Sequence, residues 1–160
     1  MSNARGSITL SAALLCAFWE LCIPSAWAAE KDLKFEAKLV WGTDDIQSKG
    51  KEQKDLKVLD PKILEKLRSV FKWKHYYEIE TKNDIIVAKG ARAKVKMSAK
   101  CELEISNLGE NRVEVTLVGE GKRVVNDKQT VTPGQLMVLG GDGHQATAWF
   151  VVLIPSKPRE

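Results

Sequence analysis

The fold is decided by residues 101–117, which read CELEISNLGENRVEVTL. Apolar residues alternate with polar ones on both sides of the central segment NLGEN, residues 107–111. A period of two predicts strands with one buried face, and the Asn and Gly residues between them predict a tight turn. The stretch therefore predicts an antiparallel hairpin. Cys101 falls on its buried face, so we expect an inert thiol, with an intermolecular disulfide as the alternative.

The same alternation continues outward in both directions. Segments 136–139 and 148–154 are apolar throughout, which is typical of strands covered on both faces, and we place Trp149 to Ile154 in the middle of a sheet. Short strands at regular spacing predict an antiparallel β-sandwich or a barrel. Further strands are expected at residues 33–41, 73–79, 85–87, 91–97 and 124–125. Turns are expected at 42–45, 81–84, 126–127 and 133–134, and a bulge or a turn at 119–121.

One amphipathic helix is predicted near the start of the mature chain. Asp60 can cap this helix, and Pro61 suits its first position, where no amide hydrogen is needed. We expect the helix to end near Lys72, and to plug one end of the sandwich or cover one face of a sheet. Residues 44–55 are polar, and we expect a mobile loop there. The apolar stripe of the helix consists of Ile63, Leu64, Leu67, Val70 and Phe71.

Residues 1–28 predict a cleaved signal peptide. A positive charge precedes an apolar run, and small residues follow in the small-x-small pattern that signal peptidase reads. Cleavage after Ala29 is the alternative. The rival interpretation is a transmembrane anchor. Glu20 interrupts the apolar run, so the uninterrupted segment is shorter than a membrane span requires. Residues 29–160 are then a single β-rich domain.

This signal predicts a periplasmic or secreted protein with no stable membrane span after cleavage. Cys16 and Cys22 leave with the signal, so Cys101 cannot form an intramolecular disulfide in the mature chain. The 25 basic and 21 acidic residues give a net charge of +4. Basic and acidic residues are interleaved along the chain, which argues against nucleic-acid binding, because nucleic-acid binders carry a one-signed patch.

Between Ile85 and Ile154 the chain shows a short strand, Lys89-Gly90, a basic strand, the turn at residues 107–109, the Pro133-Gly134 turn and a final apolar strand. In this order the features resemble the immunoglobulin-like modules common in exported bacterial proteins. The resemblance implies an immunoglobulin-like β-sandwich but no particular function. The whole sequence also resembles small exported bacterial proteins to which no activity is attached.

No group of residues predicts catalysis, a metal site or a cofactor. His75, His144 and Cys101 lack the short spacing of metal ligands, and residues 44–55 lack the spacing of a calcium loop. Residues 140–144 (GGDGH) precede a strand, whereas a phosphate loop precedes a helix. No serine lies in a nucleophile-elbow pattern. We therefore predict a non-enzymatic protein with no catalytic residue, metal or cofactor.

The predicted function is binding of another envelope or secreted protein. Arg92, Lys94 and Lys96 share one face of the basic strand, which we interpret as a sheet edge protected by charge and able to accept a partner strand. An enzyme of unknown type is one alternative, which would need a pocket holding His75 or His144 beside a carboxylate.

A second alternative is carbohydrate or small-ligand binding through Trp73, Tyr76 and Trp41. Residues 71–77 (FKWKHYY) interleave aromatic side chains with lysines, and such side chains can stack on sugars. The competing interpretation places Phe71, Trp73 and Tyr77 in the core, where the helix joins the next strand. In either case Tyr76 is expected on the outward face, as the best exposed contact residue.

Overall fold

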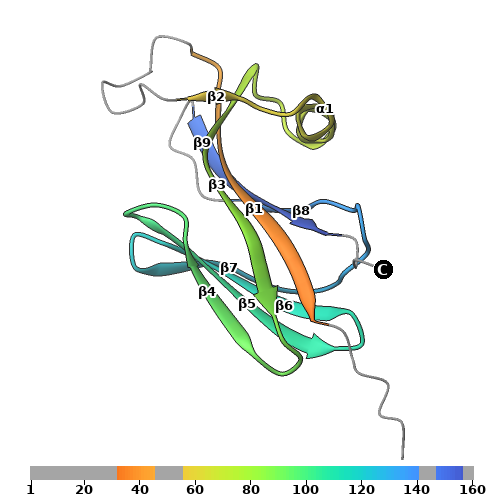
Figure 1. The fold of residues 1–160 in the computed structure, drawn as a ribbon. Coiled ribbons are helices and arrows are strands. Elements are labelled where there is room, and N and C mark those ends of the chain that lie inside the picture. Colours follow the sequence, from red (N-terminus) through yellow and green to blue (C-terminus); the bar gives the residue numbers. More distant parts are fainter. Residues whose placement is uncertain (1–31, 46–55, 141–146, 157–160) are drawn as a thin grey trace, which may run out of the picture.

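The protein is mainly β and consists of two packed antiparallel sheets with one short helix, in a computed structural model that describes residues 32–45, 56–140 and 147–156 (Figure 1). The predicted signal peptide, most of the predicted loop at 44–55 and residues 141–144 lie outside the described residues. The elements are β1 (Leu33–Thr43), β2 (Lys57–Val58), α1 (Pro61–Val70), β3 (His75–Val87), β4 (Arg92–Lys96), β5 (Cys101–Gly109), β6 (Arg112–Gly119), β7 (Lys122–Thr130), β8 (Met137–Gly140) and β9 (Thr147–Pro155).

The two sheets enclose the first hydrophobic core. One sheet has the strand order β2-β3-β1-β9-β8 and the other β4-β5-β6-β7. The predicted hairpin over residues 101–117 is confirmed, because β5 pairs antiparallel with β6 and turns at Glu110-Asn111, both of which have positive φ. Its apolar face is buried against β1 and β9, with Leu103 and Leu117 fully buried.

A second core lies on the other face of the five-stranded sheet, which α1 covers (Figure 1). The predicted cap is confirmed: Asp60 Oδ1 accepts a hydrogen bond of 2.9 Å from the Lys62 N–H, and Pro61 begins the helix. Ile63 and Leu67 are buried against the sheet. The helix ends at Val70, two residues before Lys72, and Val70 is 70% exposed rather than part of the buried stripe.

The position of β9 in the middle of a sheet is confirmed, since β9 lies between β1 and β8. Val151 and Leu153 face the first core, and Phe150 and Val152 face the second. The apolar segment 136–139 forms part of β8, which is an edge strand. Its side chains are apolar on both faces because a hydrophobic core covers each face of the sheet. This does not require a neighbouring strand at each edge of β8.

Two of the predicted turns are wrong. At residues 81–84 strand β3 continues through a β-bulge, because the β1 partners Phe35 and Ala37 pair with Ile85 and Lys82. At this bulge Asp84 has a φ of 56°, a left-handed conformation that Asp tolerates better than most residues. At residues 126–127 strand β7 runs on without a turn, because pairing with β6 holds it in register to Thr130.

The immunoglobulin topology is not confirmed. The four-stranded sheet is a meander of consecutive strands, whereas an immunoglobulin sandwich brings non-consecutive strands into each sheet. The structure supports the coarser description of two packed antiparallel sheets. Across the described residues, no helix has the length and apolar character needed to cross a membrane.

Candidate functional site

A cleft of about 720 Å³ lies between the two sheets at one end of the sandwich. The five-stranded sheet contributes Trp41, Ile79 and Trp149 to its lining. The four-stranded sheet contributes residues near its β4–β5 and β6–β7 turns, among them Lys122 and Val124. Clefts of this size with mostly apolar walls are typical of ligand sites.

An aromatic row crosses the five-stranded sheet at this end. Trp41 of β1 lies opposite Tyr77 of β3 on one side and opposite Trp149 of β9 on the other. Directly opposed residues share a face of the sheet, so the three rings form one row. The ring centroids of Trp41 and Tyr77 are 5.8 Å apart, and His75 stacks beyond Tyr77 at 6.5 Å. Trp41, in the centre, is only 7% exposed.

Trp149 approaches the four-stranded sheet at Gly119, the last residue of β6. A Cβ atom at Gly119 would lie 2.9 Å from Trp149 Cζ2 and 3.0 Å from Val124 Cγ2. Real Cβ atoms are almost never found this close to another heavy atom, so a glycine is required here. The absence of a side chain at Gly119 therefore sets how closely the two walls of the cleft meet.

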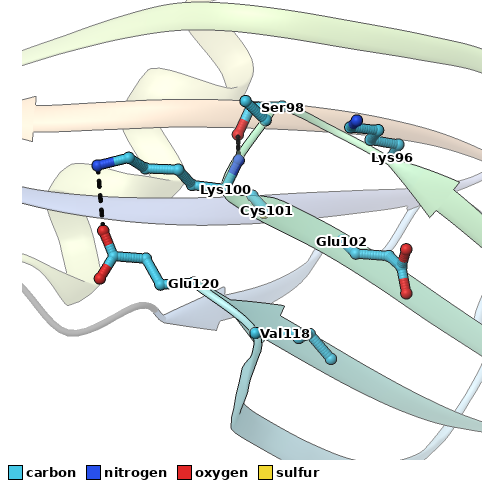
Figure 2. Close-up of a pocket in the computed structure, with 9 residues that line it drawn as sticks. Lys96, Ser98, Lys100, Cys101, Glu102, Val118 and Glu120 are labelled. Atoms are coloured by element: carbon cyan, nitrogen blue, oxygen red, sulfur yellow. Dashed lines mark hydrogen bonds and ion pairs between the residues drawn. The ribbon is translucent and has the colours of Figure 1, made fainter.

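The rim of the cleft carries an ion pair between two turns. Lys100 of the β4–β5 turn and Glu120 of the β6–β7 turn reach toward one another, with 3.2 Å between Nζ and Oε1 (Figure 2). The Ser98 Oγ accepts a 3.2 Å hydrogen bond from the Lys100 N–H. Both members of the pair are more than 70% exposed, so the pair contributes about 0.2–1 kcal/mol at most.

Both residues of this ion pair also line a second hollow of about 550 Å³ beside the β4–β5 turn. Figure 2 shows this hollow, with Lys96, Glu102 and Val118 on its walls. Four of the nine residues that line it are charged, and it has no aromatic residue, whereas the cleft between the sheets has Trp41 and Trp149 in its lining. We therefore take the cleft as the candidate site.

Cys101 borders both hollows, but its sulfur is buried. Burial raises the pKa of the thiol to about 11, because the thiolate would lose its hydration. At neutral pH the thiol is therefore protonated, and the protonated form is a poor nucleophile. Burial of Cys101, expected from the alternation in β5, is confirmed.

The predicted contact residues Arg92, Lys94 and Lys96 lie on β4, which is an edge of the four-stranded sheet as expected. The Lys94 ammonium lies 2.6 Å from a carboxylate oxygen of Glu104 on the neighbouring strand. That hydrogen bond raises the pKa of Lys94 and lowers the pKa of Glu104. Arg92 contacts the same carboxylate at 3.6 Å. Much of the basic charge of β4 is thus neutralised within the sheet.

The expectation that Tyr76 is exposed is wrong. Tyr76 is 5% exposed and packs in the second core under α1, and its hydroxyl donates a hydrogen bond of 3.1 Å to the Phe71 carbonyl. Trp73 is half-buried against the same core, and a Cβ at Gly42 would lie 3.0 Å from its ring. Trp73 and Tyr76 therefore belong to the helix-covered face, while Trp41 belongs to the cleft. The three side chains do not form one platform.

Sequence reasoning missed Tyr77 and Trp149 as neighbours of Trp41. Each is the third residue of its strand, Tyr77 in β3 and Trp149 in β9. The available signal was only that each of three predicted strands contains an aromatic residue on one face. Only the register of β3, β1 and β9 brings them into one row, and register between distant strands is not encoded locally.

The described ranges contain no group of three or more His, Cys, Asp or Glu side chains arranged to hold a metal ion. Comparison of the chain with protein-family models, with curated proteins and with solved structures finds no match.

Proposed function

We propose that the chain is an exported, non-enzymatic β-sandwich module that binds another envelope or secreted protein by accepting one of its strands. The observation that carries the proposal is the edge strand β7. The resemblance of residues 85–154 to immunoglobulin-like modules adds support only by analogy, because a fold of that kind does not fix a function.

Strand β7 offers a long, open backbone edge. It is nine residues long, and seven of these residues are exposed. Among the described strands it pairs with β6 alone. From Val125 to Thr130 the pairing with β6 is regular, so every second residue of β7 turns its N–H and C=O away from β6. Within the strand, the Lys128 N–H already donates a 2.8 Å hydrogen bond to Asp127 Oδ1, which an incoming strand would have to replace. Such an edge can pair with an extended segment of another chain.

The charge of β7 points to the chemistry of the partner strand. Lys122, Arg123 and Lys128 are opposed by Asp127 alone, which gives a net charge of three minus one, or +2. Opposite charges on facing strands stabilise the pairing, and like charges oppose it. We therefore propose an acidic extended segment as the partner. Edge β4 is the weaker acceptor, because it has five residues and Glu104 already pairs with its basic side chains.

A non-enzymatic role fits the chemistry of the described residues. The thiol of Cys101 is protonated at neutral pH, and His75 lines neither the cleft nor the second hollow. His144, the other histidine of the enzyme alternative, lies outside the described residues. Export rests on the predicted signal at residues 1–28, and a periplasmic or secreted location is part of the proposal.

The test is capture of partners from the native envelope fraction, using protein expressed from the full chain and purified. The variant Arg123→Glu/Lys128→Glu reverses the charge of the β7 edge. The control Lys62→Glu/Lys66→Glu makes the same change in net charge on the exposed side of α1. We expect a stoichiometric acidic partner to bind wild type and the control and to bind the β7 variant at least tenfold more weakly. Equal capture by all three proteins would overturn the proposal.

Carbohydrate binding is the weaker alternative. It requires exposed aromatic faces, whereas Tyr76 and Trp41 are buried and Trp73 is half-buried. Retention of glycan from the envelope fraction without any protein partner would favour it over strand addition.

A further inference from the structure

The cleft between the sheets has a chemistry of its own, although Lys122 and Val124 of β7 are part of its lining. Its lining includes the indole rings of Trp41 and Trp149. Two further lining residues, which we call the lips, are Ile79 of β3 and Val124 of β7; they belong to opposite sheets and are 38% and 37% exposed. Partly exposed aliphatic side chains on two sides of one cleft present apolar surface that water solvates poorly.

The aliphatic lips favour an apolar chain over a sugar. A sugar carries hydroxyl groups around its whole ring, and Ile79 and Val124 offer no hydrogen bond to any of them. Hydroxyl groups buried without partners would cost binding energy. Trp41 is buried below the lips, so a thin chain that enters the cleft can reach its ring, but a sugar ring resting on the surface cannot.

The charge at the rim favours an acid. Lys100 and Glu120 neutralise one another in their ion pair. Lys122 also lines the cleft and makes no ion pair with any residue in the described ranges. The lining therefore has one uncompensated positive charge, carried by a flexible side chain next to Val124. A ligand with an apolar chain and one anionic head group would match both features.

We propose that this cleft binds a free single-chain carboxylate amphiphile, with its alkyl chain between Trp41, Trp149, Ile79 and Val124 and its carboxylate at Lys122. The volume of about 720 Å³ lies within the range of about 300–1,000 Å³ that is usual for small-molecule sites. The occupant is the free acid in solution, as opposed to an acyl chain anchored in a membrane.

The first experiment compares three probes that share a ten-carbon chain, namely decanoate, decanol and decyltrimethylammonium. Binding to the protein expressed from the full chain is measured by calorimetry and by the change in tryptophan fluorescence. We expect one site for decanoate, with about tenfold weaker binding of decanol, because a charge-assisted hydrogen bond is lost, and still weaker binding of the cation. Equal binding of all three probes, or no binding of decanoate, would overturn the proposal.

Matched variants locate the site. Ile79→Asn places an amide on one lip, and the control Ile86→Asn makes the same change on β3 at a residue that is 59% exposed and does not line the cleft. Lys122→Gln removes the rim charge, and its control is Lys62→Gln on the exposed side of α1, at a residue that does not line the cleft. We expect Ile79→Asn and Lys122→Gln to weaken decanoate binding at least tenfold and both controls to leave it unchanged. The opposite pattern would refute the site.

The source of the acid is tested with vesicles. Neutral phosphatidylcholine vesicles, and vesicles that contain anionic phosphatidylglycerol, are sedimented with the protein. Binding to decanoate without sedimentation supports a site for the free acid. Sedimentation with anionic vesicles without binding of decanoate would overturn the proposal in favour of a membrane surface. Because Lys122→Gln leaves Arg123 and Lys128 in place, failure of this site and failure of strand addition at β7 are distinguishable.

Discussion

The close approach of Trp149 to Gly119 predicts a specific response to adding one methyl group. In Gly119→Ala the new Cβ would meet Trp149 Cζ2 at 2.9 Å and Val124 Cγ2 at 3.0 Å. The indole ring is rigid and is held in the row beside Trp41, so relief requires the walls of the cleft to move apart. Overpacking of this kind costs about 1–3 kcal/mol. We expect Gly119→Ala to lower the free energy of unfolding by that amount, measured by urea denaturation.

A matched glycine separates this clash from the general effect of alanine. Gly140 has no atom within 4 Å of the position of an added Cβ. Gly140→Ala should therefore leave stability unchanged or raise it by up to about 1 kcal/mol, through a smaller entropy of the unfolded chain. The reasoning is refuted if Gly119→Ala is no more destabilising than Gly140→Ala.

A second substitution tests whether Trp149 is the cause. Trp149→Phe removes Cζ2 and Cη2, the ring atoms nearest the added methyl group. In this background we expect Gly119→Ala to cost about 1 kcal/mol less than in wild type, since residues in contact show coupling of this size. Additive effects of the two substitutions would assign the cost to Val124 or to the backbone instead.

Three further predictions concern the cores and the titrating groups. Leu67→Ala should lower the free energy of unfolding by about 2–5 kcal/mol, because Leu67 of α1 is fully buried against the five-stranded sheet, and a loss below about 1 kcal/mol in urea denaturation would mean that α1 packs loosely. Burial opposes the charge of Glu78, but its hydrogen bonds with Lys38 and Thr81 prevail and lower its pKa from 4.5. The stability from Glu78 is thus present above pH 4.5 and lost as the pH falls through the lowered value. Glu78→Gln should therefore flatten the acid side of the profile of unfolding free energy against pH, measured by urea denaturation. Cys101 should react with a thiol reagent far more slowly in the folded protein at pH 8 than after denaturation, because burial raises its pKa to about 11; similar rates would show that the thiol is accessible.

Local patterns predicted most of the strands and the helix. The Asp60-Pro61 start is a local signal, because the cap and the proline act within one turn of the helix. The alternation in β5 and β6 is likewise local, because each strand carries its own buried face. These features follow from neighbouring residues, and the structure confirms them.

The errors arose where tertiary contacts override local preference. Asp84 and its neighbours look like a turn in sequence, but pairing with β1 keeps them in one bulged strand. Tyr76 lies between Lys74 and Glu78 in sequence and was expected outside, yet α1 covers that face of β3. The cleft could not be predicted for a related reason. The meeting of Trp41 and Trp149 in its lining depends on pairing between strands far apart in the chain.

The central claim is that β7 is an open edge that accepts a strand. Residue-resolved hydrogen exchange of the backbone amides, with and without a captured partner, tests it most directly. In the free protein we predict that alternate amides of β7, those that point away from β6, exchange fast while their neighbours are protected. In the complex the fast amides should become protected, and the amides of β4 should not change. Uniform protection of β7 in the free protein, or partner-induced protection confined to β4, would contradict the account.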